Sequence, residues 1–208
     1  MLRFTILGSG SSGNCAYLET DDTRLLVYAG RFSEEKNLHV LRAAMVLLGK
    51  PYHLLLIGGG RSARPSHNVS MLPYRRDSIE LAQWLASADA LVHAGSSETF
   101  GLVIIEAMAC GRPVIGVRAG AVPELVDEHV GELAEPGDAA SMAQAIRRLY
   151  ERDLDAVGAT ARARTLQRFT WSQVLQMQLA SYAGVFGWSR GPSAVRPIMQ
   201  ADRYGAQS

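Results

Sequence analysis

Two carboxylates separated by seven residues, Glu98 and Glu106, are the side chains best placed to do chemistry in this sequence. Both lie in residues 96–114, SSETFGLVIIEAMACGRPV, where a predicted strand is followed by a predicted helix. In a parallel sheet this is where helix N-termini face a ligand. Gly101 opens the helix, and a glycine there lets backbone amides approach an anion closely. The segment therefore predicts a binding site for an anionic ligand.

Glu106 is the one ionisable residue in the middle of the helix predicted over residues 102–110. This helix is apolar on nearly every side, so we expect it to be buried. A buried carboxylate needs a hydrogen-bonding partner, and vicinal sugar hydroxyls would serve. Other interpretations stay open: Glu106 on a narrow solvent-facing stripe or at the cap of a neighbouring loop, and Glu98 as an ordinary surface charge.

Two cations, Arg31 and Lys36, lie at another transition from strand to helix, in residues 30–37, GRFSEEKN. A cation in the first turn of a helix is disfavoured by the helix dipole, by ~0.3–1 kcal/mol. A phosphate group bound there would explain both residues, because Arg31 offers a planar fork and Lys36 a point charge. The alternative is an exposed helix start on which Glu34 and Glu35 balance the cations.

The elements that must position these residues alternate between strand and helix. A strand is predicted at residues 24–29, in which residues 25–29 are an unbroken apolar run, typical of a strand covered on both faces. Further strands are predicted at residues 53–57, 69–72, 90–93 and 114–117, and helices at 78–87, 102–110, 154–168 and 171–186. Ser33 and Asp138 are the predicted caps of two more helices. This alternation predicts an α/β fold, a Rossmann-like open parallel sheet with helices on both faces.

Residues 30–37 and 96–114, with a third segment at 120–124 (GAVPE), resemble the C-terminal, donor-binding domain of the retaining GT-B glycosyltransferases of family 4. That family has two glutamates seven residues apart in the frame S-x-E-x-F-G-L-x-x-x-E-A-M-A-C-G-x-P-V. The frame is long and therefore specific, and the resemblance extends from about residue 25 to residue 186.

The resemblance implies a role for each matching residue of the second segment. Glu98 would contact the hydroxyls of the transferred sugar, and Glu106 would hold the ribose of the nucleotide. The backbone amides around Phe100, Gly101 and Leu102 would reach the diphosphate.

The first segment matches the family element G-R-x-x-x-x-K through Gly30, Arg31 and Lys36. This element neutralises the departing nucleoside diphosphate, so the resemblance makes Glu98, Arg31 and Lys36 candidate catalytic residues. Tyr74 lies, with the adjacent arginine, where such proteins place their nucleobase contacts. Fixed cations and amides stabilise the charge that develops on the diphosphate. We therefore expect retaining transfer without metal or cofactor, from a donor such as GDP-mannose or UDP-glucose.

Residues 1–24 depart from the family pattern. A complete enzyme of this kind has an N-terminal Rossmann-like domain that binds the acceptor, and we expect that half to be missing here. Residues 1–24 instead resemble the opening hairpin of metallo-β-lactamase-fold hydrolases. The zinc-binding run H-x-H-x-D-H of those hydrolases is not in the sequence, and the five histidines are scattered, so no metal site is predicted.

Two further motif matches are weak evidence for the functions that these motifs usually mark. Residues 8–13 spell G-x-G-x-x-G, but a strand rather than a helix is predicted to follow, so we interpret them as a hairpin loop. Residues 153–155 spell Asp-x-Asp, the metal motif of other sugar transferases. No strand precedes them, and we interpret the match as a coincidence.

The composition excludes several classes of protein. A net charge of +1 predicts no nucleic-acid partner and at most peripheral membrane contact. Cys15 and Cys110 form neither a disulfide framework nor a zinc-ligand set. The N-terminus lacks the apolar run of a signal peptide, and no segment approaches the ~18 apolar residues of a membrane span. We therefore expect a cytoplasmic protein.

Three parts follow from these patterns: a β-hairpin extension at residues 1–24, a nucleotide-sugar-binding domain at residues 25–186, and a disordered tail at residues 187–208. Two functions stay open, a catalytic glycosyltransferase and a truncated module that binds a nucleotide sugar without turning it over. A GT-B epimerase fits the glutamate pair less well. The predicted partners are the nucleotide sugar and either a separate acceptor-binding domain or a second copy of the chain.

Overall fold

The structure is a computed structural model that describes residues 2–10, 13–20, 23–59 and 66–186. The predicted tail at residues 187–208 lies outside the described residues. The chain divides into two compact units, Met1–Thr165 and Leu166–Ser208. None of the described helices combines the length and the apolar character that crossing a membrane requires.

A β-hairpin begins the chain. Strand β1 (Leu2–Gly10) pairs antiparallel with β2 (Gly13–Thr20) in a sheet of their own. Gly10 lies opposite Gly13, so the G-x-G-x-x-G residues close a hairpin, as the sequence predicted, and open no helix.

The main sheet has six parallel strands in the order β5-β4-β3-β6-β7-β8. They are β3 (Arg24–Ala29), β4 (Tyr52–Ile57), β5 (Val69–Leu72), β6 (Ala90–Val92), β7 (Val114–Val117) and β8 (Gly131–Ala134). The chain winds outward from β3 to β5, returns to β6 beside β3, and then winds the other way. This doubly wound order confirms the predicted Rossmann-like fold and places its topological switch point between β3 and β6.

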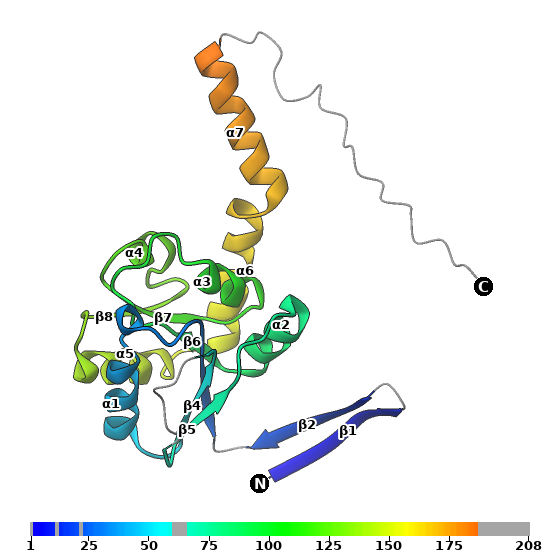
Figure 1. Cartoon of the computed structure of the whole chain (residues 1–208), viewed down its shortest axis with the longest axis vertical. Helices are drawn as coiled ribbons and strands as arrows, with labels where there is room; N and C mark the ends of the chain where they lie inside the picture. Colours follow the sequence, from blue (N-terminus) through cyan, green and yellow to red (C-terminus); the bar gives the residue numbers. More distant parts are fainter. Residues whose placement is uncertain (1, 11–12, 21–22, 60–65, 187–208) are drawn as a thin grey trace. The chain divides into compact units, whose positions relative to one another are not determined.

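Helices cover both faces of this sheet (Figure 1). They are α1 (Leu38–Leu48), α2 (Ser78–Ser87), α3 (Leu102–Ala109), α4 (Val122–Leu125), α5 (Ala139–Leu149) and α6 (Leu154–Arg168). The last helix, α7 (Trp171–Phe186), belongs to the second compact unit. Helices α1 and α5 pack side by side, and α2 packs against α3. Asp138 caps α5 as predicted, because its carboxylate accepts from the amides of Ala140 and Ser141.

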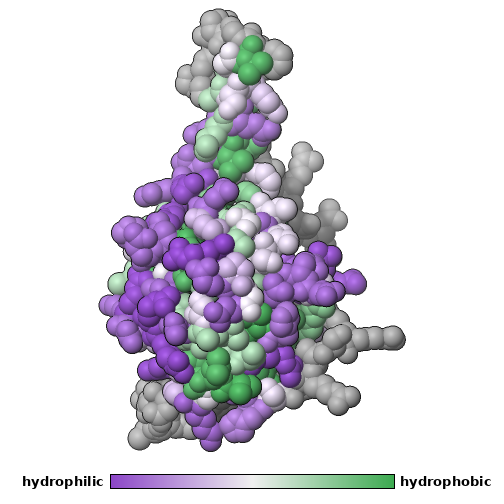
Figure 2. Space-filling model, turned by 90° about the vertical axis from the view of Figure 1, so that its left-hand side faces the viewer, coloured by the Kyte–Doolittle hydropathy of each residue, from purple (hydrophilic) through white to green (hydrophobic). Residues whose placement is uncertain are grey.

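The largest apolar cluster joins one side of the sheet to α1 and α5. Alternate strand residues face it, since successive side chains of a strand point to opposite sides. Its buried strand members include Leu26, Tyr28, Leu54, Leu56, Ile115 and Val117. The outer surface seen in Figure 2 is mostly hydrophilic, with an apolar patch in its lower part. Burial therefore ties the strands to their helices and holds the strand ends in place.

The structure corrects the predicted start of the first helix. Ser33 precedes only a 3-10 turn, η1 (Glu34–Lys36), and its hydroxyl donates to Glu35 rather than capping a helix. Asn37 then takes a left-handed conformation with φ of 52°, and α1 begins at Leu38. Lys36 thus ends a separate turn, so the predicted dipole penalty of a first-turn cation does not apply to it.

Two short elements, α4 and β8, were not predicted. Each has four residues, too few for a periodic pattern, and β8 begins with glycine and glutamate. The expectation that the helix after Gly101 is buried holds for one face only: Ile104, Ile105, Ala107 and Met108 are buried, whereas Leu102 is 64% exposed and Glu106 is exposed. Asp153, from the Asp-x-Asp match, accepts from the amide of Ala156 in the first turn of α6.

Candidate functional site

The predicted site segments follow the two central strands. Residues 30–36 leave the carboxyl end of β3, and residues 93–101 leave the carboxyl end of β6. These strands are neighbours in the sheet although their helices lie on different faces. Ligands of open α/β sheets bind in the crevice outside the carboxyl ends of the strands at such a switch point.

Lys36 and Glu98 form the central contact between the two segments. The Nζ atom of Lys36 lies 2.8 Å from Oε2 of Glu98, and these side chains are only 19% and 16% exposed. Asn37 strengthens the junction, since its Nδ2 donates to the carbonyl of Ala94 at 3.1 Å and to the Ser96 hydroxyl at 3.4 Å. The structure therefore brings together a cation and a carboxylate that the sequence placed in separate segments.

The Glu98 carboxylate has three donors around it. Lys36 and His93 both contact Oε2, with Nε2 of His93 at 3.2 Å, while the amide of Gly101 donates to Oε1 at 3.2 Å. Burial by itself raises the pKa of Glu98, but the hydrogen bond and charge of Lys36, aided by His93 and Gly101, lower it below its usual value. Glu98 is therefore ionised at neutral pH.

His93 is a residue of this cluster that the sequence did not single out. Its side chain is 2% exposed, and its Nδ1 is buried without a hydrogen-bond partner among the described residues. Burial lowers the pKa of His93 despite the nearby carboxylate, so the ring is neutral. The available signal was its position: a histidine directly after an apolar strand, five residues before Glu98.

Two glycines shape the loop that carries Glu98. Gly101 has φ of 78°, and a Cβ there would lie 2.8 Å from a Leu125 methyl. Gly120 has φ of 56°, and a Cβ there would lie 2.5 Å from the Glu98 carbonyl oxygen. Ala121, in the third predicted segment, donates its amide to that carbonyl at 2.9 Å. The segment 120–124 thus supports the backbone of Glu98.

The N-terminus of α3 adjoins the ion pair. Gly101 is its N-cap, in a left-handed conformation that suits glycine. The first amides of an α-helix lack intrahelical acceptors and favour an anion. Phe100 and Leu102 are 52% and 64% exposed. Fixed amides, Lys36 and Glu98 therefore combine donors for an anion with an acceptor for hydroxyls.

Arg31, Glu106 and Tyr74 make no direct contact with the Lys36–Glu98 pair in the part of the chain that the structure describes. The Arg31 side chain is 81% exposed, with its guanidinium 3.8 Å from Glu35. Its backbone is held, because the Tyr28 hydroxyl donates to the Arg31 carbonyl at 2.8 Å. Tyr74 is 64% exposed.

Glu106 lines a small cavity of about 190 Å³ between α2 and α3, together with Cys110 and residues of α2. Burial raises the pKa of Glu106 above its usual value. The Glu106 carboxylate is thus partly desolvated, although Glu106 lies on the exposed side of α3. This arrangement is intermediate between a buried carboxylate and one on a solvent-facing stripe, which the sequence left open.

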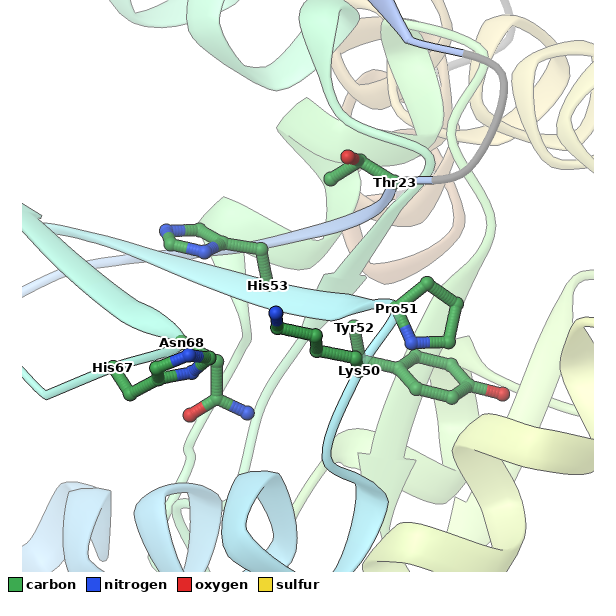
Figure 3. Close-up of a pocket in the computed structure, with 7 residues that line it drawn as sticks. All are labelled: Thr23, Lys50, Pro51, Tyr52, His53, His67 and Asn68. Carbon is green, nitrogen blue, oxygen red and sulfur yellow. The ribbon is translucent and has the colours of Figure 1, made fainter. Parts of the chain in front are cut away.

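A larger cavity, of about 410 Å³, lies at the opposite edge of the sheet (Figure 3). It is lined by Thr23, Lys50, Pro51, Tyr52, His53, His67 and Asn68. These residues precede or begin β3, β4 and β5, whereas the ion pair follows the carboxyl ends of strands. No cluster of three or more metal-ligating side chains occurs among the residues that the structure describes.

The fold and the site together define a class of protein: a doubly wound parallel α/β domain whose switch point carries donors for an anionic ligand. The family model for glycosyl transferases group 1 matches residues 23–152, and the chain belongs to this family.

Individual relatives agree with the family. The chain is 31% identical over 158 residues to sulfoquinovosyl transferase SQD2 of Arabidopsis thaliana, covering 71% of this chain and 31% of that protein. The crystal structure of Anabaena HepE with UDP-glucose matches with a TM-score of 0.68 at 26% identity, over 78% of this chain and 49% of that one. Sucrose-phosphate synthase from Thermosynechococcus elongatus matches with a TM-score of 0.70 at 30% identity, over 80% and 46%. The chain therefore spans less than half the length of each relative.

Proposed function

We propose that this domain binds the nucleotide-diphosphate sugar of a retaining, metal-independent glycosyl transfer. The observation that carries the proposal is the Lys36–Glu98 pair at the switch point, beside the N-terminus of α3. Lys36, Arg31 and the amides around Gly101 face the developing charge of the diphosphate leaving group. Glu98 accepts hydrogen bonds from the sugar, and Glu106 and Tyr74 serve the nucleoside.

We propose a UDP-sugar as the preferred donor. HepE, which is similar over the same domain, was crystallised with UDP-glucose. A guanine nucleotide such as GDP-mannose is the alternative, and the exposed Tyr74 offers a ring face to either base.

A second candidate function is a binding module that holds the nucleotide sugar without turning it over. The observation in its favour is that the Lys36–Glu98 pair and the N-terminus of α3, which the proposal assigns to the donor, all lie within this one domain. The acceptor-binding part would then come from a separate domain or a second copy of the chain. Both candidates require the same donor site.

Calorimetry with UDP, GDP and ADP tests the donor site. We expect Lys36→Ala and Arg31→Ala to weaken binding of the preferred nucleotide by at least about tenfold, because each removes a charge-assisted contact with the diphosphate. Lys50→Ala removes an exposed lysine at the opposite edge of the sheet and is the matched control. Equal affinities of parent and both site variants would overturn the phosphate assignment.

A further inference from the structure

His93 is buried beneath the ion pair and is fixed from two sides. Its backbone amide donates to the carbonyl of Ile115 on β7 at 2.8 Å, which anchors the residue at the end of β6. Gly95 covers the ring so closely that a Cβ there would lie 2.9 Å from Cε1 of His93 and 3.4 Å from Cδ of Lys36. The imidazole therefore has a single orientation, with Nε2 toward the Glu98 carboxylate.

The surroundings also determine the tautomer of this neutral ring. Nε2 lies 3.2 Å from an ionised carboxylate oxygen, so it must carry the proton and donate it. Nδ1 has no partner among the described residues, and a proton on that atom would be a buried donor without an acceptor. Glu98 thus receives a neutral, buried donor that does not depend on Lys36.

A bound diphosphate would compete with Glu98 for the ammonium group of Lys36. This ammonium group is paired with Oε2 of Glu98 at 2.8 Å, and turning toward a phosphate would remove the strongest donor from that oxygen. Two donors would remain on the carboxylate: Nε2 of His93 on Oε2 and the amide of Gly101 on Oε1. Both belong to rigid parts of the fold.

We propose that His93 is a positioning residue, which keeps the Glu98 carboxylate aimed at the sugar when Lys36 exchanges from Glu98 to the diphosphate of the donor. The sugar-binding part of this inference rests on the proposed function. The orientation of Glu98 by His93 does not, because it is a property of the ligand-free chain.

Nuclear magnetic resonance of the ligand-free full chain tests the orientation. We expect the ¹⁵N spectrum to show His93 as the neutral tautomer with its proton on Nε2. We expect His93→Phe to raise the pKa of Glu98, followed through its ¹³Cδ shift, and His93→Gln, which keeps a donor, to restore most of the change. The charged and titratable groups that act on Glu98 are Lys36, His93 and Tyr28, and only His93 is altered. A proton on Nδ1 of His93 in the parent chain overturns the proposal, and so does a Glu98 pKa that is the same in His93→Phe as in the parent chain.

Calorimetry with UDP and UDP-glucose tests the consequence for the sugar. We expect His93→Phe to reduce the affinity for UDP-glucose relative to UDP by about tenfold, the effect of a lost charge-assisted hydrogen bond, and His93→Gln to stay close to the parent. His129→Phe, which alters an exposed histidine, is the control. An equal loss for both ligands, or no rescue by glutamine, shows a merely structural role and overturns the proposal. A parent chain that binds neither ligand refutes the proposed function, while the magnetic resonance still decides the orientation of Glu98.

Discussion

At the scale of single residues, the charge of Glu98 is the best-supported property of the site. Lys36 and His93 converge on one oxygen, and the Gly101 amide contacts the other. The resulting low pKa has a consequence for folding. A carboxyl whose pKa is lower in the folded chain contributes stability above its unfolded pKa and loses it as the pH falls through the folded value.

We therefore predict that Glu98→Gln destabilises the chain at pH 7, by about 1–2 kcal/mol, because Lys36 loses its charged partner in a partly buried position. The difference from the parent should shrink as the pH falls below the usual carboxyl value of 4.5, since Glu98 then becomes neutral as well. Urea unfolding at several pH values measures this. Glu128→Gln, at an 83% exposed side chain, is the control, and a difference that persists at low pH would contradict the prediction.

At the scale of elements, the loops after β3, β6 and β7 position the site together. The 3-10 turn η1 carries Lys36, the loop after β6 carries Glu98, and the segment at residues 120–124 supports the Glu98 backbone from the far side. Gly120 lies so close to this backbone that an added Cβ would be 2.5 Å from the Glu98 carbonyl oxygen and 3.0 Å from the Glu98 amide nitrogen.

Gly120→Ala should therefore displace the Glu98 loop and weaken UDP-glucose binding, in addition to an unfolding cost of about 1 kcal/mol for alanine at positive φ. Gly137→Ala is a close match, because Gly137 also has positive φ, 74°, but has nothing within 4 Å of an added Cβ. We expect both variants to lose stability and only Gly120→Ala to lose affinity. The same affinity for both would show that the 120–124 segment does not support the site. Thermal melts and calorimetry supply the two measurements.

At the scale of the whole molecule, the chain belongs to the glycosyl transferases group 1 family, and its matched part spans 31% to 49% of the relatives described above. Under the proposed function, the site at the switch point contacts the leaving group and the sugar of the donor. For the proposed transfer an acceptor must also reach the sugar, and none of the contacts described above is assigned to that acceptor.

We accordingly predict negligible glycosyl transfer by the chain alone, at protein concentrations where calorimetry shows UDP-glucose bound. The release of UDP from UDP-glucose, followed with time, measures turnover. A clear rate that scales with the chain's concentration and is abolished by Lys36→Ala would show that a second domain is dispensable.

Much of the fold could be predicted because its signals are local. The apolar run of β3 and the cap at Asp138 each depend on neighbours in the sequence, and the predicted bounds of β3, β5, β7, α2, α6 and α7 agree with the structure. The start of α1 was wrong because the left-handed Asn37, tied to Ala94, breaks the helix at a point that no periodicity marks.

The sequence by itself determined the alternation of strands and helices, and which two turns hold the cations and carboxylates. Only the tertiary structure decided that Lys36 meets Glu98, 62 positions away, that a buried histidine shares the same oxygen, and that Glu106 faces α2 instead. The physical reason is that hydrophobic periodicity acts over a few residues, whereas these contacts depend on the order in which the strands are laid side by side.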